Sequence, residues 1–116
     1  MASLSTHVLD TARGRPAAGV IIDLHVLEND AREHLKTLVT NQDGRPVEPF
    51  SGGGLASGIY ELTFHAADYF RNSGVSLPTP PFIGDVVVRF GIADPSANYH
   101  VPLLISPYGY CTYQGS

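Results

Sequence analysis

The stretch Asp85-Val86-Val87-Val88-Arg89-Phe90-Gly91-Ile92 carries the clearest strand pattern in the chain. Every second residue of it is a large apolar one, and these side chains are Val86, Val88, Phe90 and Ile92. Successive side chains of a β-strand point to opposite sides, so these four fall on one face of an extended segment. The stretch therefore predicts a strand with one apolar face.

The same two-residue period recurs on both sides of this stretch. It predicts six further strands, at residues 4–11, 20–28, 34–40, 58–65, 98–105 and 108–114. Turns rich in Gly, Pro, Asn and Asp separate them, residues 13–16 among them. Residues 66–73 are the only helical candidate, ended by Gly74. Short strands with frequent turns indicate an all-β protein, and we predict one antiparallel β-sandwich domain over residues 1–116.

Length, charge and cysteine content exclude several classes of protein. A chain of 116 residues is long enough for one domain with its own core. Its formal charge of −4 argues against nucleic acid as a partner, because phosphate binding needs a basic patch. No apolar run approaches the roughly 20 residues that span a bilayer, and residues 1–5 lack the features of a secretory signal. Cys111 is the only cysteine, and we expect a cytoplasmic protein with no membrane partner.

Two segments at opposite ends of the chain each place a histidine in a strand-like context. They are Ser5-Thr6-His7-Val8-Leu9-Asp10 and Tyr99-His100-Val101-Pro102-Leu103-Leu104. Alternation puts His7 on the face opposite Val8, and His100 on the face of Leu104. If the first strand neighbours the last two in one sheet, His7, His100 and Tyr113 lie on one surface. Function at the end of the chain requires an ordered C-terminus, since free termini normally fray.

Other kinds of site fit these residues less well. The five histidines and Cys111 contain no closely spaced pair of the kind that binds a metal ion. A Ser-His-Asp hydrolase would lack its G-x-S-x-G turn, and Cys111 in a run of Tyr and Thr is more typical of a core residue than of a nucleophile. Residue type alone leaves His7 open as a surface histidine and Arg45 as a solvated loop arginine. No carboxylate pair is evident among the aspartates Asp10, Asp23 and Asp85.

The two end segments, together with Asp43-Gly44-Arg45 and the C-terminal Tyr113-Gln114-Gly115-Ser116, resemble the 5-hydroxyisourate hydrolases. These are the enzymatic branch of the transthyretin-like proteins, and the resemblance spans nearly the whole chain. It implies a transthyretin-like β-sandwich of two four-stranded sheets with one short helix. It also implies a homotetramer in which each active site uses residues of two subunits.

The resemblance further implies a reaction, the hydrolytic opening of the lactam ring of 5-hydroxyisourate, which is the product of urate oxidation. His7 and His100 match the family's two active histidines, one as general base on water and the other orienting water or substrate. Arg45 would bind the purine-derived ring and stabilise charge on its oxygens. Tyr113 would wall the site and offer a hydroxyl. No cofactor or metal is implied, and the partner is a small-molecule substrate.

One position departs from the family, which usually ends Tyr-Arg-Gly-Ser where this chain has Gln114. Glutamine can still form hydrogen bonds but lacks the positive charge of arginine. Gln114 and Ser116 are therefore possible substrate contacts, not main ones. Alternation places Gln114 opposite Cys111 and Tyr113, which favours a structural role for it. Two alternatives stay open at this point: a divergent paralogue acting on a related lactam, and a non-catalytic carrier of a small ligand.

Overall fold

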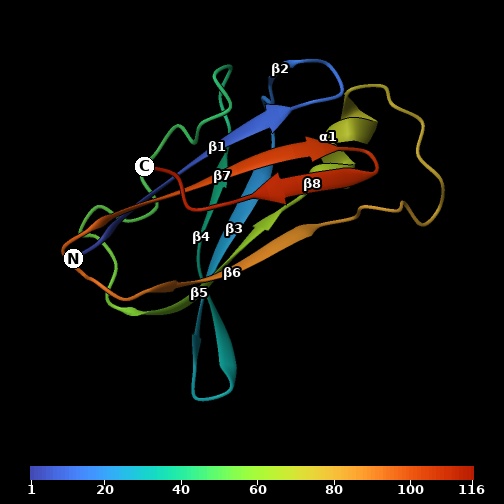
Figure 1. The fold of residues 1–116 in the computed structure, drawn as a ribbon. Coiled ribbons are helices and arrows are strands. Elements are labelled where there is room, and N and C mark those ends of the chain that lie inside the picture. Colours follow the sequence, from blue (N-terminus) through green and yellow to red (C-terminus); the bar gives the residue numbers. More distant parts are fainter.

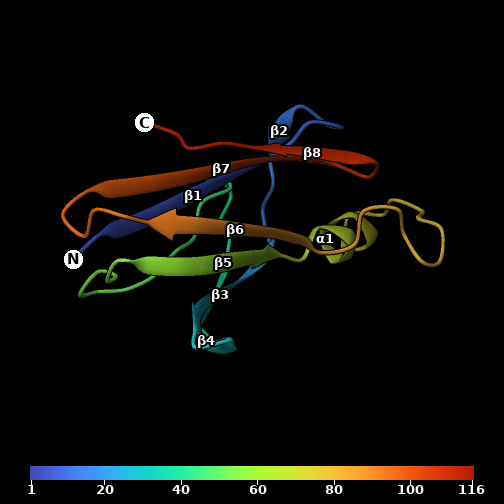
Figure 2. The same ribbon diagram turned by 60° about the horizontal axis from the view of Figure 1, so that its bottom comes forward.

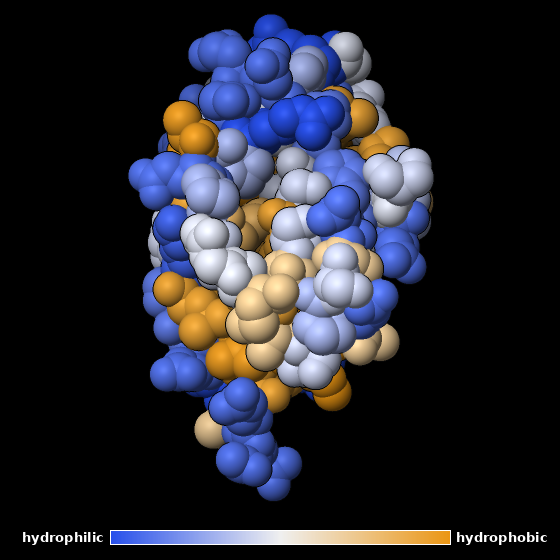
Figure 3. All heavy atoms as spheres, turned by 90° about the vertical axis from the view of Figure 1, so that its left-hand side faces the viewer, coloured by the Kyte–Doolittle hydropathy of each residue, from blue (hydrophilic) through white to orange (hydrophobic).

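Two four-stranded sheets face each other in the computed structural model, which describes all 116 residues (Figures 1 and 2). The first sheet has the strand order β2-β1-β7-β8, formed by Arg15–Pro16, Ser3–Asp10, Asn98–Ser106 and Gly109–Thr112. The second has the order β4-β3-β5-β6, formed by Ala31–Val39, Ile21–Glu28, Gly58–Phe64 and Val86–Ile92. The helix α1, Ala66–Asn72, lies at one end of the sandwich. Figure 3 views the opposite end, which holds both termini, and shows an apolar area between polar margins.

The predicted sandwich of two four-stranded sheets with one short helix is confirmed. Three details differ from the prediction. The strand expected at 34–40 begins at Ala31, because Asn29 and Asp30 make a tight turn with φ values of 51° and 62° and strand pairing resumes directly after it. Residues 13–16, expected to be a turn, include the short strand β2. The sandwich is not antiparallel throughout, since β1 and β7 pair in parallel.

Alternation along the strands decides which side chains form the core between the sheets. In β1 Val8 is fully buried, whereas His7 and Leu9 on the other face are half-buried. The second sheet contributes a larger set of apolar side chains to this core, among them Ile22, Leu24, Leu62, Phe64 and Val86. Full burial of one such side chain stabilises the fold by about 1.5–3 kcal/mol, so a one-residue slip of β1 would be costly. The core thereby turns the His7 face of the first sheet outward.

Helix α1 is attached to the sandwich by its aromatic residues. Tyr69 and Phe70 are buried. The Tyr69 hydroxyl donates a hydrogen bond to Asp10 Oδ2 at 2.8 Å, and Asp10 Oδ1 accepts the N–H groups of Ala12 and Arg13 at 3.0 and 3.1 Å. The buried Asp10 carboxylate is therefore satisfied and serves the fold. The structure contains no helix long and apolar enough to cross a membrane.

Asp23 and Asp85, which show no pairing in the sequence, are joined by His65. The His65 ring lies with Nε2 2.8 Å from Asp23 Oδ2 and Nδ1 3.2 Å from Asp85 Oδ1. The hydrogen bond with Asp23 raises the pKa of His65, burial opposes this, and the charge of Asp85 adds to it. Burial alone would raise the pKa of Asp23, but hydrogen bonds from His65 and Thr37 outweigh it and lower that pKa. The three groups tie β3 to the start of α1 and to the segment before β6.

We expect the substitution His65→Gln to lower the free energy of unfolding by roughly 1–2 kcal/mol near pH 6, because a charged hydrogen-bonded bridge is lost. A histidine with a raised folded-state pKa contributes its full stability below its ordinary pKa of 6.5 and loses it as pH rises through the folded value. The difference in unfolding free energy between wild type and His65→Gln should therefore be smaller at about pH 9 than near pH 6. Urea unfolding at fixed protein concentration measures it at both pH values.

Lys36→Gln is the matched control for this experiment, because Lys36 lies in the same sheet and the substitution removes its surface ion pair with Glu48 and its hydrogen bond to the Pro49 carbonyl. Surface pairs contribute little, so its effect should be small and equal at both pH values. If His65→Gln lowers the free energy of unfolding equally at both pH values, a stabilising bridge from charged His65 to the two aspartates is contradicted.

Candidate active site

The parallel pairing of β1 with β7 brings the two histidines onto one face of the first sheet. Register places Ser5 beside His100 and His7 beside Pro102. Paired residues of neighbouring strands point to the same side, so His7 and His100 are two ladder positions apart on the outer face. Leu9 and Leu104, which are also half-buried, continue that face. The sequence prediction that both histidines share a surface holds in the structure.

The loop from Asn41 to Arg45 packs against the same part of β1. Its Gly44 carbonyl accepts the Val8 N–H at 2.8 Å. Gly44 has a φ of 77°, and a Cβ there would lie 2.3 Å from the Val8 carbonyl oxygen and 3.3 Å from His7 Cδ2. Only glycine fits this approach. Gly44 therefore lets the loop pack on β1 beside His7, and this places the next residue, Arg45, near the two histidines.

Asn41 holds this loop in shape and is a residue that the sequence analysis missed. Its side-chain Oδ1 accepts the N–H groups of Asp43 at 2.9 Å and Arg45 at 3.2 Å. Its own N–H donates to the Arg45 carbonyl at 2.7 Å. An asparagine two residues before an Asp-Gly pair is the signal of such a turn, because its side chain binds backbone N–H groups two residues on.

Electrostatics link the two histidines and the arginine. Burial of the ring lowers the pKa of His100, and the positive charge of Arg45 and the proximity of His7 lower it further. His100 therefore holds a proton less readily than an ordinary histidine. A neutral imidazole can accept a proton, and a guanidinium beside it can stabilise an anion. These are the requirements of hydrolysis by a base-activated water.

The C-terminal tail returns to His100 after the last strand. The Gly115 N–H donates to the His100 carbonyl at 2.8 Å, which ties the tail to β7. A Cβ at position 115 would lie 2.6 Å from His100 Cδ2, so the glycine allows the tail to pass close to the ring. Tyr113, 57% exposed, stands on the tail near His100. Ser116 follows as the exposed last residue.

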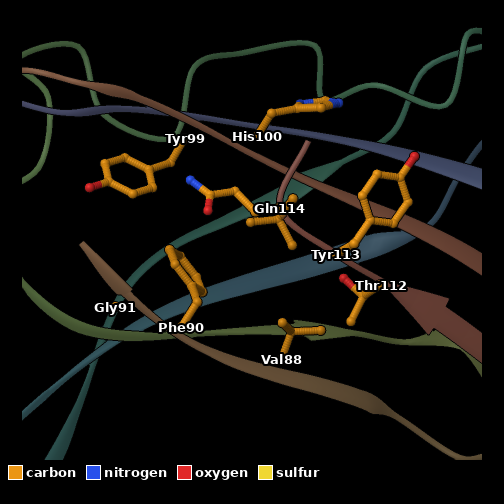
Figure 4. Close-up of a pocket in the computed structure, with 9 residues that line it drawn as sticks. Val88, Phe90, Gly91, Tyr99, His100, Thr112, Tyr113 and Gln114 are labelled. Atoms are coloured by element: carbon orange, nitrogen blue, oxygen red, sulfur yellow. The ribbon is translucent and has the colours of Figure 1, made fainter. Parts of the chain in front are cut away.

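Gln114 points elsewhere. It lines a cavity of about 250 Å³ between the edges of the two sheets, and Phe90, Tyr99, His100 and Tyr113 line the same cavity. Figure 4 shows the Gln114 amide directed toward Tyr99, while the imidazole of His100 points away from it. The structure thus gathers His7, Arg45 and His100, with Tyr113 beside them, and directs the Gln114 amide away from the His100 imidazole.

No group of three or more His, Cys, Asp or Glu side chains in the chain is arranged to hold a metal ion. Cys111 is a free, exposed thiol on β8 rather than the buried core residue that its sequence context suggested. It pairs with Leu104 in the ladder, so it lies on the histidine face but two strands from His7.

Known proteins resemble this chain over its whole length. The sequence model of the HIUase/Transthyretin family matches residues 4–115. The protein 5-hydroxyisourate hydrolase 2 of Rhizobium meliloti (strain 1021) is 61% identical over 114 residues, which are 97% of this chain and 95% of that protein. The crystal structure of (S)-allantoin synthase matches with a TM-score of 0.91 and 40% identity, over 99% of this chain and 44% of that one. Klebsiella pneumoniae 5-hydroxyisourate hydrolase matches with a TM-score of 0.85 and 37% identity, over 100% of both chains.

Proposed function

Since the chain belongs to the HIUase/Transthyretin family, we propose that the face bearing His7, Arg45 and His100 is its active site. The chain is a 5-hydroxyisourate hydrolase, an enzyme that opens a cyclic amide with water. One observation above all supports the proposed site: His100 is half-buried, beside Arg45 and His7, with its pKa lowered by burial and by those two neighbours. A residue perturbed by specific charged neighbours is a good candidate for acid–base chemistry.

In the proposed mechanism, one of the two histidines takes a proton from water as the water oxygen bonds to the lactam carbonyl carbon. The carbonyl oxygen becomes negatively charged, and Arg45 donates hydrogen bonds to it. The intermediate then collapses, the ring C–N bond breaks, and the histidinium returns its proton to the departing nitrogen. Water is thus added across the amide bond, and no other reactant is consumed.

Arg45 and Tyr113 are proposed as substrate contacts, together with His7. The Arg45 side chain is exposed, and its planar fork of N–H donors suits adjacent carbonyl oxygens of a flat ring. The exposed Tyr113 ring offers a wall and a hydroxyl near His100. Ser116 stays a possible contact, because Gly115 holds the tail beside His100.

The experiment that tests this function exposes the purified protein to freshly generated 5-hydroxyisourate. We expect the ultraviolet signal of the substrate to decay faster than in buffer, in proportion to protein concentration. Circular dichroism of the product should show one enantiomer in excess, which the uncatalysed reaction cannot give. A protein that only binds the ligand would leave the decay unaccelerated and the product racemic, and that result would refute the proposal.

Gln114→Arg should leave kcat/KM for 5-hydroxyisourate within about twofold, because the position-114 side chain points toward Tyr99, while the His100 imidazole points away from it. An arginine that reached the reacting oxygens would add a charged hydrogen bond and raise the rate by roughly tenfold. Steady-state kinetics decide between these outcomes. Thermal unfolding is measured in parallel, because a charge placed in the cavity that Gln114 lines should lower stability instead.

We also propose that four copies of the chain assemble, with sites shared between subunits. The outer face of the first sheet supports this, because Leu9 and Leu104 are apolar, point outward and are only half-buried in the single chain. Such a face is typical of a surface that another subunit covers. Light scattering should give about four times the 12.4 kDa subunit mass. A monomer would rule out a site built from two subunits.

The cytoplasm is the compartment that we propose for this enzyme. Cys111 is free and exposed, and no second cysteine exists to pair with it. An exposed thiol persists best where cellular reductants keep it reduced.

A further inference from the structure

His100 carries a hydrogen bond that His7 lacks. Its Nδ1 lies 2.8 Å from the Ser5 hydroxyl oxygen, whereas none of the side-chain hydrogen bonds of the structure involves the His7 ring. The contact follows from register, since Ser5 and His100 are direct partners in the parallel ladder and face the same side. The two residues are 95 positions apart in the chain, so only the fold brings them together.

Two neighbours restrict the position of the His100 ring. Ser5 occupies Nδ1 on one side, and the tail at Gly115 passes close to Cδ2 on another, leaving no room for a Cβ there. Nε2 then remains as the ring nitrogen with no hydrogen-bond partner in the chain. If His100 acts on water, it must act through Nε2, and the neutral ring can do so as a base only when its proton is on Nδ1.

Ser5 offers an acceptor for that proton. Its hydroxyl oxygen can accept as well as donate, and it lies at hydrogen-bond distance from Nδ1. A proton on Nδ1 therefore has an acceptor within the chain, whereas a proton on Nε2 has none. This contact favours the tautomer with its proton on Nδ1.

We propose that Ser5 is a positioning residue that accepts the Nδ1–H of His100, holds Nε2 unprotonated, and thereby makes His100 rather than His7 the general base. This proposal rests on the proposed function for the reaction itself, but the tautomer can be measured without substrate. His7, whose ring makes no such bond, is then the histidine that orients the water or the substrate.

Nitrogen NMR of the full-length, histidine-labelled protein is the direct test, because protonated and unprotonated ring nitrogens resonate far apart. At about pH 8, where the ring is neutral, we expect His100 to show a protonated Nδ1 and an unprotonated Nε2. Ser5→Ala removes the hydroxyl acceptor, and both tautomers should then be populated. A wild-type spectrum with the proton on Nε2 would overturn the proposal, whatever the variants do.

Kinetics give the second readout. Ser5→Ala should lower kcat roughly tenfold with a much smaller change in KM, because the loss concerns the base and not substrate binding. Ser5→Thr keeps a hydroxyl on the same strand and should restore both the rate and the tautomer. Equal rates and spectra in wild type and Ser5→Ala would refute a positioning role.

Ser3→Ala is the matched control. Ser3 lies on the same face of β1, and its hydroxyl donates to Asn98, its own ladder partner, at 2.5 Å. The substitution thus removes the same group from the adjacent outward-facing pair, and it should leave rate and tautomer unchanged. If wild type shows the expected tautomer but does not hydrolyse 5-hydroxyisourate, the proposed function fails and the tautomer assignment stands, so the two failures are distinguishable.

Discussion

Replacing His100 by alanine is expected to lower kcat for 5-hydroxyisourate by roughly 10²–10⁴, the range that a positioned general base contributes. The ring that accepts the proton from water is lost, while Arg45 and His7 remain to bind the substrate. KM should therefore change far less than kcat. Steady-state kinetics under saturating substrate measure the effect directly. The apolar interior is not touched, because His100 lies on the outer face of β7.

His7→Ala and His34→Ala complete this experiment. His7→Ala should also reduce turnover, because water or substrate is no longer oriented beside His100. His34 stands on β4 of the other sheet, where its Nε2 bonds to Thr37 at 2.8 Å, so its loss should leave turnover unchanged. Light scattering and circular dichroism verify that each variant assembles and folds. Full activity in a folded His100→Ala protein would show that this histidine is structural.

Arg45→Ala is expected to lower kcat/KM by roughly 10²–10³, comparable to the loss of one donor to a developing oxyanion. Arg45→Lys keeps the positive charge but loses the planar fork of N–H donors, so its activity should lie between those of the wild type and Arg45→Ala. We also expect Arg45→Ala to change the pH dependence of the rate. The positive charge of Arg45 helps to lower the pKa of His100, so without it that pKa rises and the acidic limb of the rate profile moves to higher pH.

Arg71→Ala provides the control for the loss of one positive charge. Arg71 is an exposed residue of α1 paired with Asp68, on the helix and not on the histidine face. Its substitution should leave both the rate and the acidic limb in place. An acidic limb that stays in place in Arg45→Ala as well would contradict the electrostatic link between Arg45 and His100.

The sequence by itself determined which residues of each strand face the core. The apolar period of two in residues 4–11 and 98–105 correctly separates the buried Val8 and Leu103 from the outward His7 and His100. This information is local, because the alternation of side chains follows from the extended backbone alone. The same holds for Gln114, which alternation places on the face opposite Tyr113.

The tertiary structure alone decided which of these residues meet. The parallel register that sets Ser5 against His100, the closing of Gly44 on β1, and the bridge of His65 to Asp23 and Asp85 join residues far apart in the chain. Contacts of this kind depend on the packing of all eight strands at once, because each register is fixed by the core that the other strands help to bury. Local patterns therefore placed the candidate residues on their strand faces, the resemblance to a family gave them catalytic roles, and the assembled sheet supplied their partners.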